Sequence, residues 1–353
     1  MSDDIAMLPT DFYVDSNGGV TMGSYINNLH PEKFSNFYPT ISTIFSKFVL
    51  LFEQTLADIV YYREQLAFND ELYLKHYDAA FGSSRSHYTV SENQAHFCQL
   101  VESDNDIIAF KRPERPKLHN ALLGQRLQAS IEMKTITLSP ESPVYDGDEW
   151  HISGLAHENI AATGIYYYDC ENISGGGLMF REFIQDDNFL CYLSGEEDIV
   201  KHNVLFDTFD GIEDLHGYYT ISQEVGQIDI KDGMCVVYPN NYQSSDIGFK
   251  LADPTKPGHC KALVFYLANP VRSVPSTAIV PPQQQTWWKH EIMKSSPIAD
   301  LPSLITNIIF RYIEWPFSVN DAVKIREQTA EFEYYEEPED NDQGFEMEFY
   351  YDC

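Results

Sequence analysis

The chain has 353 residues, of which 43% are hydrophobic and 14% aromatic, so it can bury a core and does not have the composition of a disordered protein. Its formal net charge of −31 disfavours binding to nucleic acid or an anionic membrane, because both require Lys and Arg to neutralise phosphate. A basic protein partner, bound through the acidic surface, is compatible with this charge.

The sequence contains no pattern typical of a membrane-spanning segment or a signal peptide. No run of about 18 apolar residues occurs, and the acidic start, Met1 to Asp4, lacks the basic and apolar regions of a signal peptide. We therefore expect a cytoplasmic protein. Its 6 cysteines are scattered without a Cys-x-x-Cys pair, which indicates reduced thiols rather than a disulfide framework or a zinc site.

Residues 1–125 are predicted to form a helical and loop region that packs on the core. Apolar residues recur at helical spacing from Tyr38 to Leu66, which predicts one amphipathic helix beginning after Pro39. Such a stripe is typical of a packing face rather than a ligand site. The prolines between Lys111 and Pro116 indicate a loop.

From residue 126 the pattern changes to short strands separated by turn residues, such as Asp146-Gly147-Asp148 and Gly175-Gly176-Gly177. This pattern predicts a jelly-roll core, also called a double-stranded β-helix, over residues 126–290. The fold class we expect is therefore mainly β with flanking helices. The predicted strands are Gln128–Leu138, Asn159–Asp169, Leu178–Phe183, Val204–Phe209, Gly217–Ser222, Gln227–Ile230, Met234–Tyr238, Ile247–Leu251 and Ala262–Leu267.

A proline-rich segment from Val280 to Trp288 leads to a predicted helical region, residues 291–330, centred on Ala322 to Glu331. Residues 331–353 combine many acidic side chains with aromatic ones and contain no Lys or Arg. Like charges resist packing, so this composition favours a flexible tail. An acidic-aromatic peptide that docks on a partner is the functional alternative.

The segment Trp150-His151-Ile152-Ser153-Gly154 resembles the metal-binding strand of a non-haem iron oxygenase. Such enzymes hold Fe(II) with two His and one Asp or Glu, and leave positions open for cosubstrate and oxygen. The first two ligands usually form a His-x-Asp/Glu motif, because residues i and i+2 of a strand point the same way. In this chain the carboxylate position is Ser153.

Several further blocks are similar to a fungal family known as domain of unknown function 4246, whose members resemble Fe(II)/2-oxoglutarate oxygenases with the jelly-roll fold. The blocks cover residues 8 to about 330, which is most of the chain. They are Leu8-Pro9, Ser24-Tyr-Ile-Asn-Asn-Leu-His-Pro31, Trp150-His151, Ala162-Thr163, Tyr166-Tyr-Tyr-Asp169, Glu171-Asn-Ile173, Phe180-Arg181, Pro239-Asn240, Pro257-Gly-His259 and Val280-Pro-Pro-Gln-Gln-Gln285.

The resemblance implies three chemical anchors: a His-x-Glu pair, a distal His after the Pro-Asn element, and an Arg after Pro-Gly-His that holds the carboxylate of 2-oxoglutarate. His151 is kept, whereas Ser153 stands at the Glu position. Ser244 stands at the distal His position and Cys260 at the Arg position. The surrounding blocks are kept. We therefore expect that the iron and 2-oxoglutarate sites are lost and that no cofactor is required.

One imidazole cannot hold Fe(II) against water, and a serine hydroxyl is a poor ligand because it stays protonated near neutral pH. His157 and Glu158 are six and seven residues beyond His151, about 20 Å along an extended strand, so they could complete a metal site only if the chain bends. His259 adjoins the lost Arg, but its family counterpart is also His, so we expect a structural role.

Three readings of the function remain open. The first is an iron-free jelly roll that binds a small apolar molecule, with metal-independent, redox-neutral catalysis by His151, such as cyclisation, isomerisation or elimination in fungal-type specialised metabolism. The second is a non-catalytic interaction or regulatory protein. The third is an iron oxygenase with atypical ligands. The side chains expected to line the pocket are Ser153, Tyr166, Tyr168, Arg181, Asn240, Ser244 and Cys260.

Two of these residues have competing interpretations. Cys260 would be a nucleophile only with a base nearby or a lowered pKa, and a buried thiol that packs as a small hydrophobe is the alternative. Arg181 could supply a cation in the pocket, or it could form an ion pair with one of many acidic neighbours. Asp169 and Glu171 could form an acid–base pair, but a structural turn is the alternative.

Overall fold

The computed structural model describes residues 7–61, 122–184, 212–215, 218–295, 297–313, 321 and 323–324. Contacts divide the chain into two compact units. The first comprises Met1–Leu56, Leu118–Leu178 and Ile228–Cys353, and the second comprises Ala57–Lys117 and Met179–Gln227. Nearly all described elements belong to the first unit.

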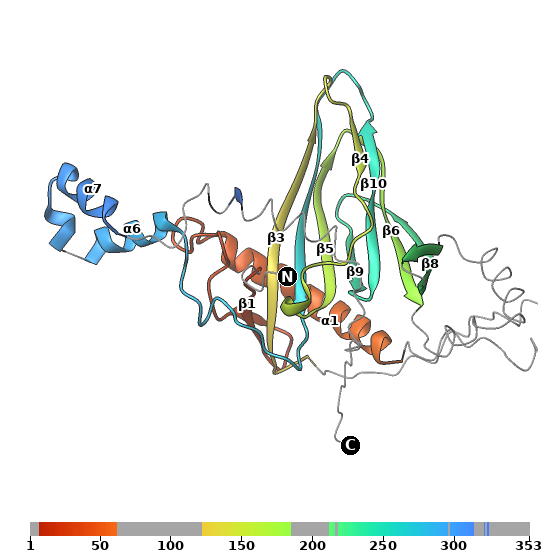
Figure 1. The fold of residues 1–353 in the computed structure, drawn as a ribbon, viewed down its shortest axis with the longest axis horizontal. Coiled ribbons are helices and arrows are strands. Elements are labelled where there is room, and N and C mark those ends of the chain that lie inside the picture. The colour runs from red at the N-terminus through yellow and green to blue at the C-terminus, as the bar shows by residue number, and fades with distance from the viewer. Residues whose placement is uncertain are drawn as a thin grey trace, which may run out of the picture. The chain divides into compact units, whose positions relative to one another are not determined.

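One antiparallel sheet has six strands, in the order β2-β1-β3-β11-β5-β9. Its long central strands β3, β5 and β11 stand side by side in Figure 1. The strands are β1 (Thr10–Val14), β2 (Val20–Met22), β3 (Arg126–Leu138), β5 (Ile160–Glu171), β9 (Cys235–Pro239) and β11 (Gly258–Ala268).

The other sheet has five strands, in the order β4-β10-β6-β8-β7. The division between the two units runs through β6 and β8, and β7 belongs to the second unit. The strands are β4 (Val144–Gly147), β6 (Ile173–Ile184), β7 (Ile212–Leu215), β8 (Tyr218–Asp229) and β10 (Tyr242–Leu251).

The order of the strands confirms the predicted fold class, which is mainly β with flanking helices and a jelly-roll core. Consecutive strands from β3 to β6 alternate between the two sheets, and so do β8 to β11. The first and last of these strands, β3 and β11, are neighbours, and they pair along their length from Gly258 opposite Leu138 to Leu267 opposite Ala129. This crossing between two antiparallel sheets is the jelly-roll arrangement.

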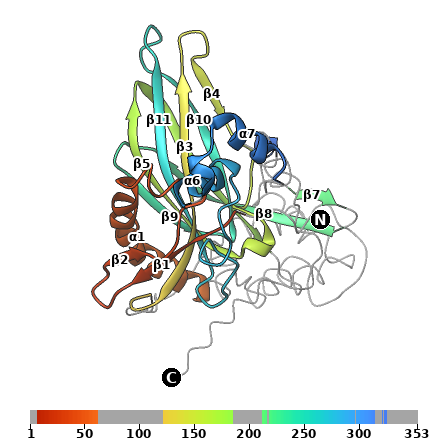
Figure 2. The same cartoon turned by 90° about the vertical axis from the view of Figure 1, so that its left-hand side faces the viewer.

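Helix α1 (Phe37–Tyr61) covers one face of the six-stranded sheet, at the lower ends of its strands in Figures 1 and 2. Its apolar stripe provides Phe45 and Phe48, whose ring centroids each lie 5.2 Å from that of Phe265 on β11. A glycine lets the helix approach β5, because a Cβ at Gly164 would come within 2.7 Å of the Phe48 ring. A helix over most of the predicted range is thus confirmed; it begins at Phe37, two residues before Pro39, and the predicted residues 62–66 lie outside the part of the chain that the structure describes.

Several short strands were not predicted. Strands β1 and β2 have five and three residues, too few to show a clear alternation. Strand β4 contains Asp146-Gly147, which we interpreted as a turn. Gly147 has φ 95°, and a Cβ there would lie 2.1 Å from the Asp246 carbonyl oxygen, so this glycine serves a close approach of two strands. Two predicted strands, Gly217–Ser222 and Gln227–Ile230, are parts of the single strand β8.

The proline-rich segment leads into helix α6 (Gln285–Ser295), which is followed by η3 (Pro297–Asp300) and α7 (Ser303–Arg311). Helix α6 thus begins a few residues before the predicted helical region. The predicted strand Val204–Phe209 and the acidic tail 331–353 lie outside the described residues. Among the helices that the structure describes, none is long and apolar enough to cross a membrane.

Candidate functional site

His151 and Ser244 lie opposite each other in an antiparallel bridge. The His151 N–H donates to the Ser244 carbonyl oxygen at 3.0 Å, and the Ser244 N–H donates back at 2.9 Å. Ser244 belongs to β10, whereas His151 precedes β5 in a short extended segment. The positions predicted for the first and the distal histidine ligand are therefore neighbours.

Ser153 is buried beside this bridge and is held by the amide of Asn240. The Ser153 N–H donates to Asn240 Oδ1 at 3.2 Å, and Asn240 Nδ2 donates to the carbonyl oxygens of Ser153 and Ile160 at 2.9 and 3.1 Å. Through Asn240, these bonds link the His151 segment to the start of β5. Asn240 thus positions the segment, and it is not among the residues that line the cavity described below.

The side chains of Ser153 and Ser244 belong to a group of buried hydroxyls. Thr163 Oγ1 donates to Ser153 Oγ at 3.1 Å, and the hydroxyls of Tyr238 and Ser244 are 3.3 Å apart. Burial raises the pKa of the Tyr238 hydroxyl, so it remains protonated near neutral pH. The hydroxyls at the carboxylate and distal histidine positions of the resembled motif are therefore hydrogen-bonded to neutral side chains.

Between Ser153 and β5 the chain bends instead of continuing as one strand. Gly154 has φ 74°, the helix η2 spans Ala156–Glu158, and Asn159 has φ 51°. The bend buries Glu158, whose carboxylate accepts the backbone N–H groups of Met7 and of Leu155, the latter at 3.1 Å. The carboxylate of Glu158 is thus engaged by backbone N–H groups of its own loop and of the N-terminal segment.

A cavity of about 210 Å³ lies between the two sheets, within the first unit. Of the predicted site residues, His151, Ser153, Ser244 and Cys260 line it. Charged and apolar side chains share its wall, whereas we predicted a pocket that binds a small apolar molecule. The remaining lining residues are Glu132, Lys134, Ile136, Tyr145, Asp148, Thr163, Ile165, Tyr167, Leu178, Ile230, Tyr238, Asp246, Ile247, Phe249, Ala262, Val264 and Tyr266.

The charged part of the wall is a lysine between two carboxylates. Lys134 Nζ bonds to Asp246 Oδ2 and lies 3.8 Å from Asp148 Oδ2, and the Tyr145 hydroxyl donates to Asp246 at 3.3 Å. Burial lowers the pKa of Lys134, but attraction to Asp246 outweighs it, so the net pKa is raised and the ammonium stays charged. Burial and the neighbouring Asp246 charge raise the pKa of Asp148.

The His151 ring lies close enough to this charged group to interact with Asp148. Its Nδ1 lies 3.0 Å from the Glu149 carbonyl oxygen, which can only accept, so Nδ1 carries the proton and the neutral ring has its lone pair on Nε2. The Asp148 carboxylate interacts electrostatically with the ring. Among the described residues, His151 belongs to no group of three His, Cys, Asp or Glu side chains close enough to hold one ion.

Cys260, at the position expected for an Arg, is a buried residue of β11 directly opposite Cys170 of β5. Burial, followed by the neighbouring Cys170, raises the pKa of the Cys260 thiol. A nucleophilic cysteine requires a lowered pKa. The environment of Cys260 therefore favours the reading as a small buried side chain.

Two predicted lining residues, Tyr166 and Tyr168, do not line this cavity. Side chains alternate along a strand, and the residue between them, Tyr167, is buried and lines the cavity. Tyr166 and Tyr168 share the opposite face of β5, with ring centroids 6.1 Å apart. Arg181 lies on the part of β6 that belongs to the second unit, and it is not among the residues that line the cavity.

The charged residues Lys134, Asp148 and Asp246 were not predicted from the sequence. Asp246 is two residues beyond Ser244 on β10, and this spacing could have indicated that it faces the same side. Asp148 was assigned only to a turn. Nothing in the sequence connects Lys134 of β3 with Asp246, because they are 112 residues apart.

Comparison with known proteins gives one broad match. The model of a family described as "Protein of unknown function (DUF4246)" matches residues 1–291. No curated protein matches the chain. A solved structure, a selenomethionine-labelled Fe(II)/(alpha)ketoglutarate-dependent dioxygenase TqaL, has 10% sequence identity and a TM-score of 0.25 over 51% of this chain and 57% of that chain. A likeness of this size supports no statement about the present chain.

Proposed function

Because the chain belongs to the family of proteins of unknown function DUF4246, its chemistry has to be inferred from the site, and we propose that its barrel binds a small molecule without iron or 2-oxoglutarate. One observation carries the proposal. His151, Ser153 and Ser244 meet at the wall of one cavity, and the two serine hydroxyls are within a group of neutral, mutually bonded side chains.

The residues at this wall do not fit Fe(II) and 2-oxoglutarate. One imidazole and two hydroxyls form a weak donor set for a divalent iron ion. The nearby carboxylates do not compensate, because Asp246 is paired with the Lys134 ammonium. A 2-oxoglutarate carboxylate is best held by the planar fork of an Arg, and the thiol of Cys260 stands at the expected position.

The size of the cavity limits the ligand. An apolar cavity of about 150 Å³ holds benzene, so a volume of about 210 Å³ suits a substituted monocyclic molecule. Apolar residues such as Phe249 and Val264 would contact its body, and the Asp148, Asp246 and His151 side would bond its polar end. The ligand we propose is therefore a small, neutral molecule with a hydroxyl group, rather than a purely apolar one.

Metal-independent catalysis is compatible with this wall. The Nε2 lone pair of His151 can accept a proton, and Asp148 can donate one in the fraction of molecules in which its carboxyl, whose pKa is raised, is protonated. Such a pair supports redox-neutral proton transfer, as in cyclisation, isomerisation or elimination. His151 is the proposed base and Asp148 the proposed acid.

The proposal can be tested by thermal shift with a panel of monocyclic phenols and alcohols. We expect members of the panel to raise the melting temperature of the wild type and of His157→Ala, an exposed control on η2. Ala262→Leu, which fills the cavity, should abolish these shifts, and His151→Ala should weaken them. The proposal is wrong if no member shifts the wild type, or if a folded Ala262→Leu variant responds as the wild type does.

A second candidate function, a non-catalytic interaction protein, is favoured by the net charge of −31. Such a protein would bind a basic partner through its acidic surface, with an affinity that falls steeply as salt rises. His151→Ala would leave that affinity unchanged, whereas it should weaken small-molecule binding in the cavity.

A further inference from the structure

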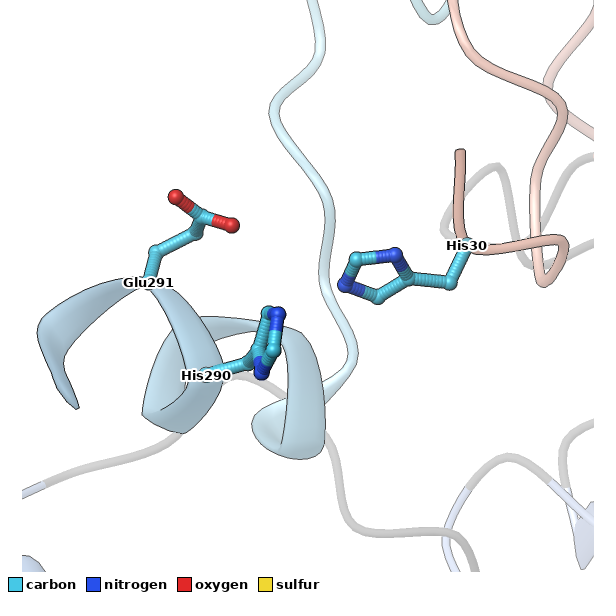
Figure 3. Close-up of side chains that lie close together, drawn as sticks. All are labelled: His30, His290 and Glu291. Atoms are coloured by element: carbon cyan, nitrogen blue, oxygen red, sulfur yellow. The ribbon is translucent and has the colours of Figure 1, made fainter. Parts of the chain in front are cut away.

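A second cluster of potential ligands lies where helix α6 meets the N-terminal segment. His30, His290 and Glu291 each offer one ligand atom, and these atoms lie within 4.8 Å of one another. Figure 3 shows the three side chains turned toward a common space between α6 and the loop that carries His30. None of them lines the cavity of the barrel.

The backbone around this cluster is held by specific contacts. His30 is buried, and its ring centroid lies 4.8 Å from that of Trp287 on α6. Gln284 Nε2 donates to the side-chain oxygens of Asn27 and Asn28 at 3.0 and 2.6 Å. These contacts hold the N-terminal loop against the start of α6 without a bound ion. The backbone that carries the three ligands is therefore already in place.

The carboxylates of the cluster converge on one cation. Lys294 Nζ lies 2.9 Å from Glu291 Oε1 and also bonds to Glu32, whose Oε2 is 3.3 Å from His290 Nε2. Two carboxylates thus share a single ammonium group, and one of them, Glu32, also contacts the His290 imidazole. An ammonium binds such groups as a point charge, and a divalent ion at the same place would add direct coordination.

We propose that His30, His290 and Glu291, with Glu32 as a fourth donor, form a binding site for a divalent transition-metal ion such as Zn²⁺. Imidazole and carboxylate donors in this number are typical of Zn²⁺ and its neighbours in the series. Bonds of about 2.0–2.2 Å bring neighbouring ligand atoms to about 3 Å. Glu32 and Glu291 are exposed, so rotation of their side chains can close the remaining distance.

Three local contacts must break when the ion binds. The Glu32 N–H donates to His30 Nδ1 at 3.2 Å, so coordination through Nε2 requires the other ring tautomer and the loss of this long bond. Lys294 must leave both carboxylates, and its side chain is 36% exposed, so it can turn into solvent. Lys294 therefore competes with the metal, and the site is occupied only when metal binding outweighs these changes.

An ion at this place would link α6 directly to the N-terminal loop. Because it binds the folded chain and not the unfolded one, it would raise the melting temperature as its concentration rises. The role is structural and does not depend on the proposed ligand of the barrel. The two proposals can therefore fail independently.

The direct test is a Zn²⁺ titration of the full-length, chelator-treated protein by calorimetry, with melting temperatures measured in parallel. We expect one equivalent to bind the wild type and the His157→Ala control with equal affinity, and to raise the melting temperature of both. His290→Ala should bind at least tenfold more weakly. Wild-type protein that binds no equivalent, or a folded His290→Ala variant with wild-type affinity, would overturn the proposal.

A further variant should raise the affinity for Zn²⁺ instead of lowering it. Lys294→Gln removes the competing ammonium, so it should bind Zn²⁺ more tightly than the wild type does. The loss of affinity in His290→Ala distinguishes this site from ordinary binding to the exposed carboxylates, which needs no imidazole. If His290→Ala does not fold, Glu291→Gln replaces it, with at least tenfold weaker binding expected because Glu291 is at the surface. Unchanged affinity in both Lys294→Gln and Glu291→Gln would contradict the site.

Discussion

The hydroxyl groups of Ser153 and Ser244 already have hydrogen-bond partners, in Thr163 and Tyr238 respectively. A buried hydroxyl that loses its partner costs about 1–3 kcal/mol. An ion that recruited both serines would have to offset this cost with two weak bonds. The local hydrogen bonding thus supports the proposal that this wall of the cavity serves an organic ligand rather than a metal.

If the site differs from an iron site only at these positions, restoring ligands should restore metal binding. The variant Ser153→Glu with Ser244→His places a carboxylate two residues beyond His151 and a second imidazole opposite it in the bridge. We expect it to bind one equivalent of Fe(II) at least tenfold more tightly than the parent, in a His290→Ala background that removes the proposed second site. Anaerobic titration measures this directly.

The matched control is Ser153→Glu with Ser245→His. Ser245 is also buried, but it follows Ser244 on β10, and its hydroxyl donates to the Asp148 carbonyl oxygen at 2.7 Å, away from the bridge partner. Side chains of adjacent residues in a strand point to opposite faces. Equal iron binding by both folded variants would show that the bridge does not define the ligand positions.

The raised pKa of Asp148 predicts a stability effect with a definite sign. Between the unfolded carboxyl pKa of about 3.9 and the higher folded pKa, the native state binds more protons, so ionised Asp148 lowers stability as pH rises. Asp148→Asn keeps the oxygen that accepts the Asp246 N–H. It should therefore stabilise the fold at pH 7, with no gain below about pH 4, where the carboxyl is protonated in both states.

Urea denaturation at several pH values measures this difference. Asp169→Asn is the control with the opposite sign, because the Lys261 and His259 side chains lower the pKa of Asp169. That variant should lose stability at neutral pH and approach the wild type as pH falls through the Asp169 pKa. A loss of stability in Asp148→Asn at pH 7 would contradict the inference that the charge of Asp148 destabilises the fold.

For individual residues, the sequence predicted a place in the site where that place follows from spacing along the chain. His151 and Ser153 lie two residues apart, and the resemblance placed Ser244 and Cys260 by their neighbours in the chain. Tyr166 and Tyr168 were assigned to the wrong face, because the periodicity of a strand gives two faces but not which one is inside. The pairing of Lys134 with Asp246 depends on two distant strands and could not be predicted.

Helix α1 packs on β5 and β11 through buried aromatic rings. The side chains of Phe45, Phe48 and Phe52 are fully buried, and Gly164 of β5 lies beneath two of these rings. An isolated amphipathic helix gains most of its stability from such a face. The glycine therefore sets how closely the helix and the sheet approach.

Gly164→Ala should destabilise the protein by about 1–3 kcal/mol, the usual cost of adding a group to a filled core. The new Cβ would lie 2.7 and 2.9 Å from atoms of the Phe48 ring and 2.9 Å from Phe52, and neither buried ring can move freely. Gly19→Ala is the control, because its Cβ would meet only the exposed carboxylate of Asp15. Denaturation midpoints that shift equally in the two variants would exclude this packing.

Helices and strands that are long enough to show a clear hydrophobic periodicity were predictable, and short ones were not. The 25 residues of α1 and the 13 residues of β3 give clear helical and strand patterns. Strand β1 is stabilised by pairing with β3, more than 100 residues away, and β2 by pairing with β1, so their own sequences carry little signal. The bend between His151 and β5 requires the positive φ of Asn159, which is rare outside glycine.

For the whole molecule, the jelly-roll class followed from many short strands separated by turns, and the order of the strands confirms it. The pairing of β3 with β11 closes a loop of more than 100 residues, and no local pattern predicts such a partner. The acidic tail lies outside the described residues, so its role as a flexible segment or a docking peptide stays a prediction.

The central claim is that the barrel does not use iron, and one measurement tests it most directly. Purified His290→Ala protein is mixed anaerobically with Fe(II) and 2-oxoglutarate, bound iron is quantified, and succinate is measured after oxygen is admitted. The account predicts less than a tenth of an equivalent of iron and no succinate above a protein-free control, as roughly expected for a single imidazole donor. One equivalent of iron that is lost on His151→Ala, together with succinate formation, would contradict it.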